Sequence, residues 1–197
     1  MSTRLKKVVM ATGNPGKLRE IQRLLEDLDV EVIAQSELGV TDADETGTTF
    51  AANSLIKAEH AAAATGLPAI ADDSGLSVDA LGGRPGVYSA RYAGLNASDQ
   101  DNVTKLLKAL EHVPKEERTA RFKCVLCIID QAGLVTYCDG SCEGQIATMV
   151  SGKSGFGYDP VFIPDGYEQS FAALGRDVKD RLSHRARAVR ALRSLLR

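Results

Sequence analysis

The feature that most constrains the fold is the alternation of short apolar runs with amphipathic helical stretches in the first third of the chain. Residues 7–11, 30–34 and 69–71 are short runs of β-branched and small apolar residues, which predicts buried strands. Between them, Leu18 begins a series of apolar residues three and four positions apart, and a second helical stretch starts at Phe50. Strands that alternate with helices predict the α/β class.

The later part of the chain adds strands that follow one another directly. Ser98, with Asp101 three residues later, forms a capping box, so we expect a helix immediately after Ser98. Strands are expected at 120–130 and 134–139, joined by a turn that ends in glycine, and a last helix is expected from about Ser183. Helical crossovers early in the chain and a hairpin later predict a mixed sheet.

The composition fits one ordinary globular domain. With 197 residues, of which 44% are hydrophobic and 25% charged, we expect a single domain over residues 1–197. The net charge of −2 provides no general basic field for nucleic acid, and we expect the arginines near the end of the chain to line a solvated helix face. Residues 1–10 lead directly into a strand pattern and no apolar run is 18 residues long, so we expect a cytoplasmic protein without a membrane partner.

Four cysteines have a spacing that resembles a zinc site. They are Cys124, Cys127, Cys138 and Cys142. Residues 121–129, however, read as a buried strand, in which positions three apart project from opposite faces. Cys124 and Cys127 should therefore be unable to share one metal ion, and we expect buried reduced thiols.

Residues 11–17 read ATGNPGK and lead from the first strand into the first helix. The P-loop pattern fails here, because Ala11 occupies its first glycine position and Leu18 follows the lysine. Amide groups at a helix start, together with Lys17, are suited to a phosphate group and suggest an anionic partner for the lysine. A plain strand-to-helix connection is equally compatible with this stretch.

Two neighbouring carboxylates stand in the stretch DDSG at 72–75, which is expected to end the third strand. Sheets of the α/β class bind ligands at such strand ends, and clustered carboxylates suit Mg²⁺, to which Glu45 would add another oxygen. If the strand is regular, Asp72 points to the face opposite Asp73. The alternative is an aspartate that caps an ordinary turn.

An aromatic residue flanked by glycines stands in SGFGYDP at 154–160. A base can stack on Phe156, because the neighbouring glycines allow close approach of a ligand, and packing of the ring into the core is the alternative. Near the last helix, Lys179, His184 and Arg185 either belong to a solvated basic helix start or present donors to a ligand edge.

Taken together, these stretches resemble the inosine triphosphate pyrophosphatase family, and within it the bacterial dITP/XTP pyrophosphatases. The resemblance rests on ATGNPGK (11–17), ADDSGL (71–76), SGFGYDPVF (154–162) and SHR (183–185), supported by ETG at 45–47. It covers essentially the whole chain, and the order and spacing of the motifs make it specific.

The resemblance implies an elongated mixed β-sheet flanked by helices, two lobes around a central cleft, and a homodimer. It implies hydrolysis of ITP, dITP and XTP to the nucleoside monophosphate and pyrophosphate with Mg²⁺. Asp73 would be the proton acceptor and a magnesium ligand, with Glu45 as a second metal contact. The residues implied in substrate binding are Thr12, Gly13, Asn14, Pro15, Gly16, Lys17, Lys57, Ser74, Phe156, Gly157, Tyr158, Asp159, Lys179, His184 and Arg185.

Two positions depart from the family pattern, since Ala rather than Gly follows Arg185, and Asp rather than Asn follows Lys179. Both departures concern fine selectivity only. Hypoxanthine and xanthine carry a 6-keto acceptor where adenine carries an amino donor, so donors from His184, Arg185 or loop amides would favour the former.

Two other functions are compatible with the residues. One is a related pyrophosphatase that acts on other modified nucleotides. The other is a non-catalytic nucleotide or nucleic-acid binder that uses the arginine-rich last helix and would bind in a strongly salt-dependent way.

Overall fold

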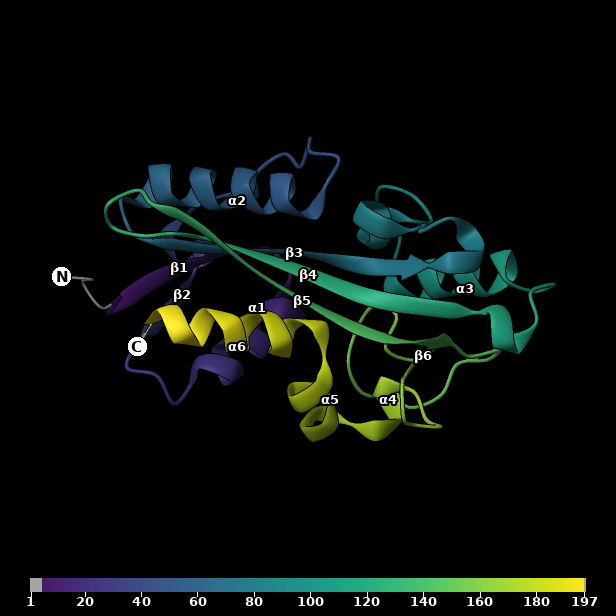
Figure 1. Cartoon of the computed structure of the whole chain (residues 1–197). Coiled ribbons are helices and arrows are strands. Elements are labelled where there is room, and N and C mark those ends of the chain that lie inside the picture. The colour runs from purple at the N-terminus through teal and green to yellow at the C-terminus, as the bar shows by residue number, and fades with distance from the viewer. Residues whose placement is uncertain (1–4, 197) are drawn as a thin grey trace. The chain divides into compact units, whose positions relative to one another are not determined.

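A computed structural model describes residues 5–196, with side chains described as far as Arg193 (Figure 1). Six strands form one sheet in the order β2-β1-β3-β4-β5-β6. The strands are β1 (Lys7–Ala11), β2 (Glu31–Ala34), β3 (Ala69–Val78), β4 (Thr119–Ile129), β5 (Val135–Ile146) and β6 (Phe162–Pro164). Strand β1 pairs in parallel with β2 and β3, whereas β5 and β6 are antiparallel, which confirms the mixed sheet of an α/β fold.

The helices lie between and after these strands. They are α1 (Pro15–Leu25), α2 (Phe50–Thr65), α3 (Asp99–Ala109), α4 (Phe171–Leu174), α5 (Arg176–Leu182) and α6 (His184–Leu196). Short 3₁₀ turns cover Gln35–Leu38, Asp79–Leu81, Gly86–Arg91 and Lys115–Glu117. The hairpin turn expected after β4 is confirmed, since the Asp130 N–H donates to the Leu134 carbonyl and Gly133 has a φ of 80°.

The chain divides into two compact units. The first unit takes the chain up to Asp73, Cys124–Gly140 and the chain from Arg185 onward, and the second takes Ser74–Lys123 and Ser141–His184. Strands β3, β4 and β5 contribute residues to both units. The single domain expected over residues 1–197 and the cleft expected between two lobes stay predictions.

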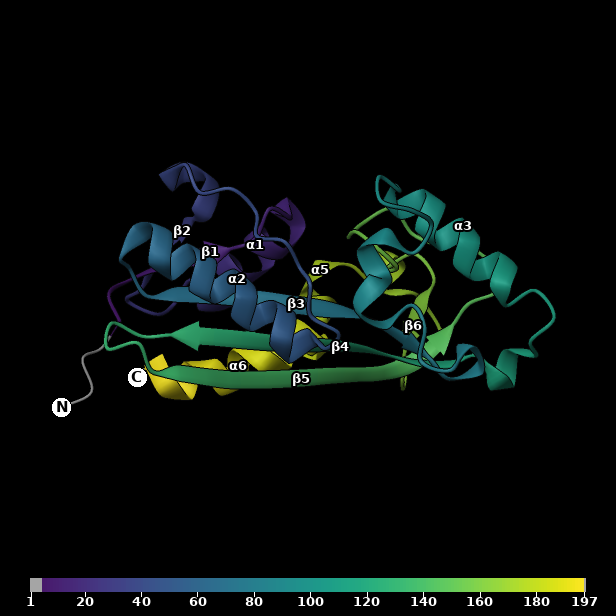
Figure 2. The same cartoon turned by 90° about the horizontal axis from the view of Figure 1, so that it is seen from above.

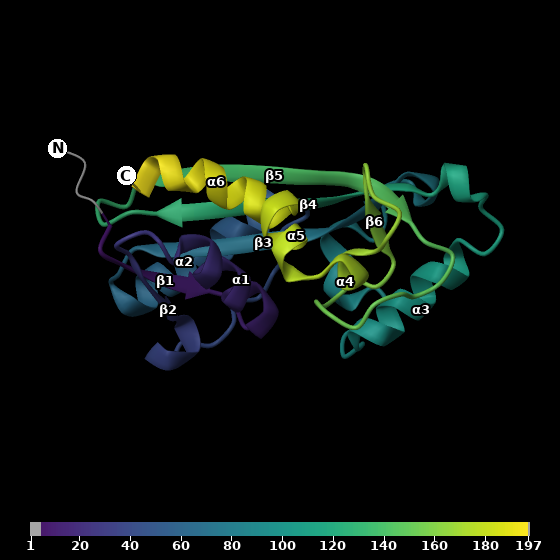
Figure 3. The same ribbon diagram turned by 90° about the horizontal axis from the view of Figure 1, so that it is seen from below.

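In the first unit, helices cover both faces of the sheet. Helix α2 lies on one face (Figure 2), and α1 and α6 lie on the other (Figure 3). Strand β1 contributes apolar side chains to the core on both faces of the sheet. Val8 packs in the cluster with α1 and α6, whereas Val9 packs with Ala58 and Ala61 of α2. Burial on both faces explains why the sequence of β1 is a continuous apolar run instead of an alternating pattern.

Strand β3 does not end at the paired aspartates, so the expected strand end at residues 72–75 is wrong. The strand continues through them to Val78, with Asp72 and Asp73 buried inside the sheet. Turn propensity is overridden here because both carboxylates find cationic partners on the two faces of the sheet. The carboxylates therefore remain in pleated backbone, where successive side chains point in opposite directions.

The cysteines behave as the strand pattern predicted. Cys124 packs in the cluster under α1 and α6, and Cys127 packs in the cluster under α2, so the two thiols lie on opposite faces of β4. All four cysteines are buried free thiols.

In the second unit, α3 and an aromatic cluster form the core. The capping box is confirmed, since Ser98 and Asp101 bond each other's backbone N–H groups at the start of α3. Three phenylalanine rings contact one another, with centroid distances of 4.6 Å for Phe122–Phe162, 5.5 Å for Phe162–Phe171 and 6.5 Å for Phe122–Phe171. These rings pack with the apolar face of α3 in one buried cluster.

Arg118 is a buried cation that binds this unit together through backbone oxygens. Its guanidinium donates to the carbonyls of Leu110 at 2.7 Å, Val113 at 3.0 Å and Ala147 at 3.2 Å. The first of these carbonyls ends α3, where the partial negative charge of a helix C-terminus favours a cation.

We expect Arg118→Gln to lower the free energy of unfolding by about 2–3 kcal/mol, because a single amide replaces a buried guanidinium that donates to three carbonyls. Urea denaturation followed by circular dichroism measures this. The same change at the exposed Arg187 should cost under about 0.5 kcal/mol, and equal losses at the two positions would contradict the role of Arg118.

Candidate functional site

The lysine turn between β1 and α1 is built around an asparagine cap. The Asn14 Oδ1 accepts the N–H groups of Gly16 at 2.8 Å and Lys17 at 3.1 Å, and Pro15 is the first helical residue. The Asn14 N–H in turn donates to the hydroxyl of Thr12 at 3.2 Å. The helix amides expected to hold phosphate are thus used within the chain, and their role toward a ligand stays a prediction.

Gly13 lets this turn approach the following loop. A Cβ at this position would lie 2.2 Å from the Asp42 Oδ2, while the other oxygen of that carboxylate accepts the side-chain amide of Gln35 at 2.5 Å. No larger side chain fits without moving Asp42. The glycine is therefore needed for close packing of the turn.

Lys17 has the anionic partner that its position at a helix start suggested. Its ammonium lies 2.5 Å from the Asp72 Oδ1. The Lys17 side chain is 15% exposed, whereas Asp72 is completely buried. The lysine therefore reaches from the start of α1 into the sheet, with a small part of its surface open to solvent.

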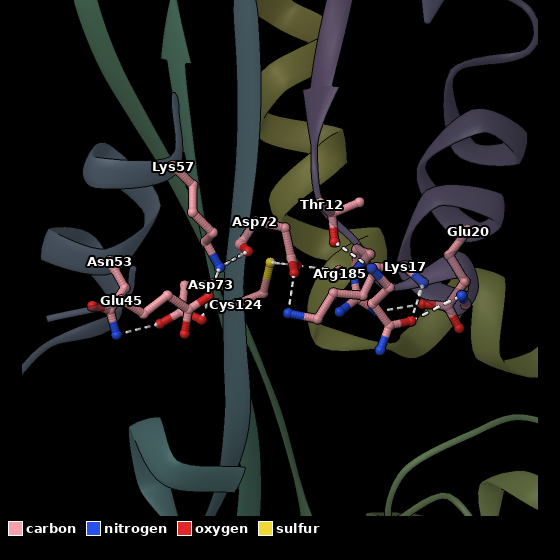
Figure 4. A network of polar contacts seen from close by, with 12 residues as sticks. Thr12, Lys17, Glu20, Glu45, Asn53, Lys57, Asp72, Asp73, Cys124 and Arg185 are labelled. Carbon is pink, nitrogen blue, oxygen red and sulfur yellow. Dashed lines mark hydrogen bonds and ion pairs between the residues drawn. The ribbon is translucent and has the colours of Figure 1, made fainter. Parts of the chain in front are cut away.

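Asp72 also binds the C-terminal helix. Its Oδ2 accepts hydrogen bonds from the Nε–H of Arg185 at 3.0 Å and from the thiol of Cys124 at 3.1 Å. The Arg185 guanidinium also forms an ion pair with Glu20 of α1 (Figure 4). Lys17, Glu20, Asp72 and Arg185 thus form a buried group of two cations and two carboxylates.

Burial alone would raise the pKa of Asp72, but the charges of Arg185, Lys17 and Lys57 hold it well below its ordinary value. Burial raises the pKa of the Cys124 thiol, and the neighbouring charge of Asp72 raises it further. Asp72 is therefore an ionised anchor at neutral pH, and Cys124 is a neutral donor.

The other face of β3 carries a second group, built on α2. The Lys57 ammonium donates to the Glu45 Oε1 at 2.6 Å, to the backbone carbonyl of Asp72 at 2.8 Å and to the Asp73 Oδ1 at 3.3 Å. The Asn53 amide donates to the remaining oxygen of Asp73 at 3.2 Å. Figure 4 shows the two groups on either side of β3, which confirms that Asp72 and Asp73 point to opposite faces.

The pKa values of the two aspartates move in opposite directions. Burial raises the pKa of Asp73, and the charges of Lys57 and Lys17 oppose this only in part. Burial would lower the pKa of Lys57, but Asp73, Glu45 and Asp72 together raise it, so the lysine stays charged. Neighbouring carboxylates whose pKa values differ in this way are typical of sites in which one carboxylate takes part in acid–base chemistry and the other provides a fixed charge.

The donor set suits a magnesium ion that shares its coordination with a substrate. Glu45 and Asp73 direct oxygens toward one cation, the Lys57 ammonium. Among residues 5–196, no group of three or more His, Cys, Asp or Glu side chains is placed to hold a metal alone. Mg²⁺ is commonly held by one or two carboxylates, with waters and phosphate oxygens at its other positions, so Glu45 and Asp73 fit it.

In the second unit, the loop at 154–160 places a cation on the face of an aromatic ring. The Asp159 Oδ2 accepts the Phe156 N–H at 2.9 Å and the Lys179 ammonium at 2.5 Å. That ammonium lies 4.3 Å from the centroid of the half-buried Phe156 ring. Gly155 permits the arrangement, with φ at +82° and no room for a Cβ beside Asp159.

The neighbouring residues of this loop are anchored elsewhere in the same unit. Tyr158 is buried and donates its hydroxyl to the Ser89 carbonyl at 2.8 Å, and burial raises its pKa. The Gly157 N–H donates to Asp99 of α3 at 2.7 Å. Tyr158, and not Phe156, is thus the aromatic residue of this loop that packs into the core.

Comparison with known proteins assigns the chain to a family. The model of the Ham1 family matches residues 8–195. The chain belongs to the Ham1 family. It is 53% identical over 197 residues to a dITP/XTP pyrophosphatase of Yersinia pseudotuberculosis, covering 98% of this chain and 99% of the relative. It is 55% identical over 190 residues to one of Vibrio parahaemolyticus, covering 95% of each.

Solved structures agree with this assignment. The Ham1 protein of Coxiella burnetii has a TM-score of 0.88 and 44% identity, covering 98% of both chains. The Ham1 protein of Staphylococcus aureus has a TM-score of 0.86 and 40% identity, covering 97% of this chain and 98% of that one. The arrangement of strands and helices in this chain is therefore the Ham1 fold.

Within this Ham1 chain, the predicted residues fall into separate groups. Lys17 and Arg185 meet at Asp72, and Lys57 and Glu45 meet at Asp73. His184 belongs to the second unit, where its ring stacks on Phe122 at 4.7 Å, and Ser74 is half-buried in β3.

Two functional neighbours were missed from the sequence. Glu20 stands three residues after Lys17 on α1, and Asn53 stands four residues before Lys57 on α2. These spacings put each beside a predicted lysine on one helix face, and that is the signal from which they were predictable.

We expect Asp72→Asn to lower the free energy of unfolding by about 3–5 kcal/mol, because it leaves Lys17 and Arg185 buried without their common counter-charge. Asp73→Asn is the matched control on the opposite face. Its cost should stay below about 1 kcal/mol, since burial already disfavours that charge. Urea denaturation of both variants at neutral pH tests this, and a smaller loss for Asp72→Asn than for Asp73→Asn would contradict it.

Proposed function

We propose that this Ham1 protein is a hydrolase of noncanonical purine nucleoside triphosphates. It converts ITP, dITP and XTP to the nucleoside monophosphate and pyrophosphate, and so removes these nucleotides from the pool used in nucleic-acid synthesis. Relatives that share over half of its residues along almost its whole length are named dITP/XTP pyrophosphatases. The observation that carries the chemistry is the group formed by Asp73, Lys57 and Glu45 beside Asp72, whose pKa is held well below its ordinary value.

The first unit takes the triphosphate. Lys17 and Lys57 supply positive charge, and the side chains of Thr12 and Asn14 supply donors to phosphate oxygens. The backbone amides of Gly16 and Lys17 would take part only by leaving the Asn14 side chain, to which they now donate. Lys17 is already stripped of most of its water and held in position by Asp72. A preorganised cation of this kind loses little conformational freedom when an anion binds.

Asp73 accepts a proton from the attacking water. The water oxygen bonds to the α-phosphorus, the bond from that phosphorus to the oxygen bridging to the β-phosphate breaks, and pyrophosphate leaves with the electron pair. The released proton goes to Asp73, whose raised pKa makes it a better base than Asp72. Mg²⁺, held by Glu45 and Asp73 when bound, would neutralise phosphate charge and orient oxygen ligands.

The second unit recognises the base. The base stacks on Phe156, and the Lys179 ammonium, 4.3 Å from the centroid of that ring, is a candidate donor to it. Loop amides and His184 are further candidates for the 6-keto oxygen. Arg185 forms ion pairs with Asp72 and Glu20, so it could bind the base only by breaking these ion pairs.

We further propose a cytoplasmic homodimer that has small-molecule nucleotides as its substrates and no stable nucleic-acid partner. The alternative of a nucleic-acid binder is weakened by its own arginines, because Arg185 pairs with two carboxylates and Arg193 pairs with Asp27. Over the part of the chain that is described, no helix has the length and apolar character needed to cross a bilayer.

The expected product pattern tests the reaction class. Incubation with ITP, dITP, XTP, ATP and GTP should release pyrophosphate, in preference to single phosphate, from the first three, and only when Mg²⁺ is present. Coupled detection of pyrophosphate and of phosphate separates the two products. Release of single phosphate would exclude the pyrophosphatase class, and similar kcat/KM values for ATP and ITP would exclude donor-based recognition of the 6-keto group.

We expect Asp73→Asn to lower kcat for ITP by about 10²- to 10⁴-fold, the range typical for loss of a general base. Glu45→Gln should raise the Mg²⁺ concentration needed for half-maximal rate, because one of two carboxylate ligands is lost. Steady-state kinetics over a Mg²⁺ series measures both effects. Near-normal turnover by Asp73→Asn would remove that residue from the proposed chemistry.

A further inference from the structure

Asn53 is a fully buried amide that uses both of its ends beside the proposed proton acceptor. Its Nδ2 donates to the Asp73 Oδ2 at 3.2 Å, and its Oδ1 accepts the backbone N–H of Gly47 at 2.8 Å. It thus connects β3 with the loop that carries Glu45. All three segments belong to the first unit.

Lys57 makes the same connection one helical turn further along α2. It binds the other carboxylate oxygen of Asp73 and the side chain of Glu45. Residues four apart share one face of a helix, so a single face of α2 holds both oxygens of Asp73. The same face holds the 45–47 loop at two points.

The close approach of this loop is built into the sequence. A Cβ on Gly47 would lie 2.6 Å from the Asn53 Oδ1 and 2.8 Å from the Ala52 Cβ, so only glycine allows the backbone to reach the amide. Burying an amide is costly unless its polar atoms are bonded, and an apolar residue would fill the same space without that cost. A buried asparagine here is therefore explained by what it orients and not by packing.

We propose that Asn53 is a positioning residue for the hydrolysis. It fixes the plane of the Asp73 carboxylate and keeps the loop of Glu45 at a set distance from it. This inference rests on the proposed function of Asp73, through which Asn53 acts. Asn53 itself needs no contact with the nucleotide.

The test compares Asn53→Leu with Ser54→Ala, its equally buried neighbour, whose hydroxyl bonds only to the Ala51 carbonyl of the same helix at 2.9 Å. Asn53→Leu should lower kcat for ITP by about 10- to 100-fold with KM changed by less than about threefold, because a misplaced reacting group costs rate more than binding. Ser54→Ala should leave kcat within about twofold. An unchanged kcat in folded Asn53→Leu, or an equal loss in both variants, would overturn the proposal.

A second readout needs no activity. Hydrogen exchange at the Gly47 amide should be slow in the wild type and about tenfold or more faster in Asn53→Leu, because that N–H loses its acceptor. It should be unchanged in Ser54→Ala. Slow exchange in Asn53→Leu would show that Asn53 does not hold the loop. If Asn53→Leu fails to fold, Asn53→Ser carries the same expectations, since its side chain is too short to reach both partners.

A double variant separates this inference from the function on which it rests. In the Asp73→Asn background and at saturating Mg²⁺, Asn53→Leu should cost no more than about twofold in residual kcat, because the carboxylate that it orients is already gone and excess Mg²⁺ compensates for a displaced Glu45. A full additional loss there would overturn action through Asp73. Near-normal activity of Asp73→Asn alone would refute the proposed base and leave the Gly47 exchange result standing.

Discussion

The organisation of the first unit depends on two adjacent carboxylates placed in the middle of a buried strand. The pleat of β3 sends Asp72 and Asp73 to opposite faces, and a buried carboxylate is tolerated only with a cation or strong donors beside it. Each face must therefore supply its own cations. Lys17 and Arg185 come from the helices on one side, and Lys57 comes from the helix on the other.

This requirement ties together distant parts of the chain. Asp72 forms ion pairs with Lys17 of the first helix and with Arg185 of the last helix. Arg185 also pairs with Glu20, which lies on the first helix. Such a group adds little stability over apolar packing, but removing one member leaves a buried charge without compensation. Its value lies in placing Lys17 and the start of α6 at fixed positions relative to β3.

Local patterns predicted most of the longer regular elements, but not the second half of β5 or the short elements β6, α4 and α5. The apolar run of β1, the capping box at Ser98 and the turn after β4 each depend on neighbours within a few residues, and all three are confirmed. The end of β3 was predicted wrongly, because residues 72–75 have the composition of a turn. The position of β3 between two other strands of the sheet, together with the ion pairs of Asp72 and Asp73, keeps that stretch extended.

The candidate site was predictable only in part. The motifs identified which residues carry chemistry, but not which of them pair with one another. The anionic partner that Lys17 required proved to be inside the chain, and the helix amides proved to be capped by Asn14. Asn53 and Glu20 share a helix face with a predicted lysine, but the sequence does not reveal that their side chains are buried.

The charges of the assembled group bear directly on how a triphosphate binds. Lys17, Lys57 and Arg185 face four carboxylates, those of Glu20, Glu45, Asp72 and Asp73, so the fully ionised group carries a net charge of −1. A group with this balance repels a polyanion despite its lysines. Two changes remove this negative balance: a divalent cation bound at Glu45 and Asp73 makes the net charge positive, whereas protonation of Asp73 makes it zero. The second would remove the proposed base, so only the cation reconciles substrate binding with catalysis in the same group.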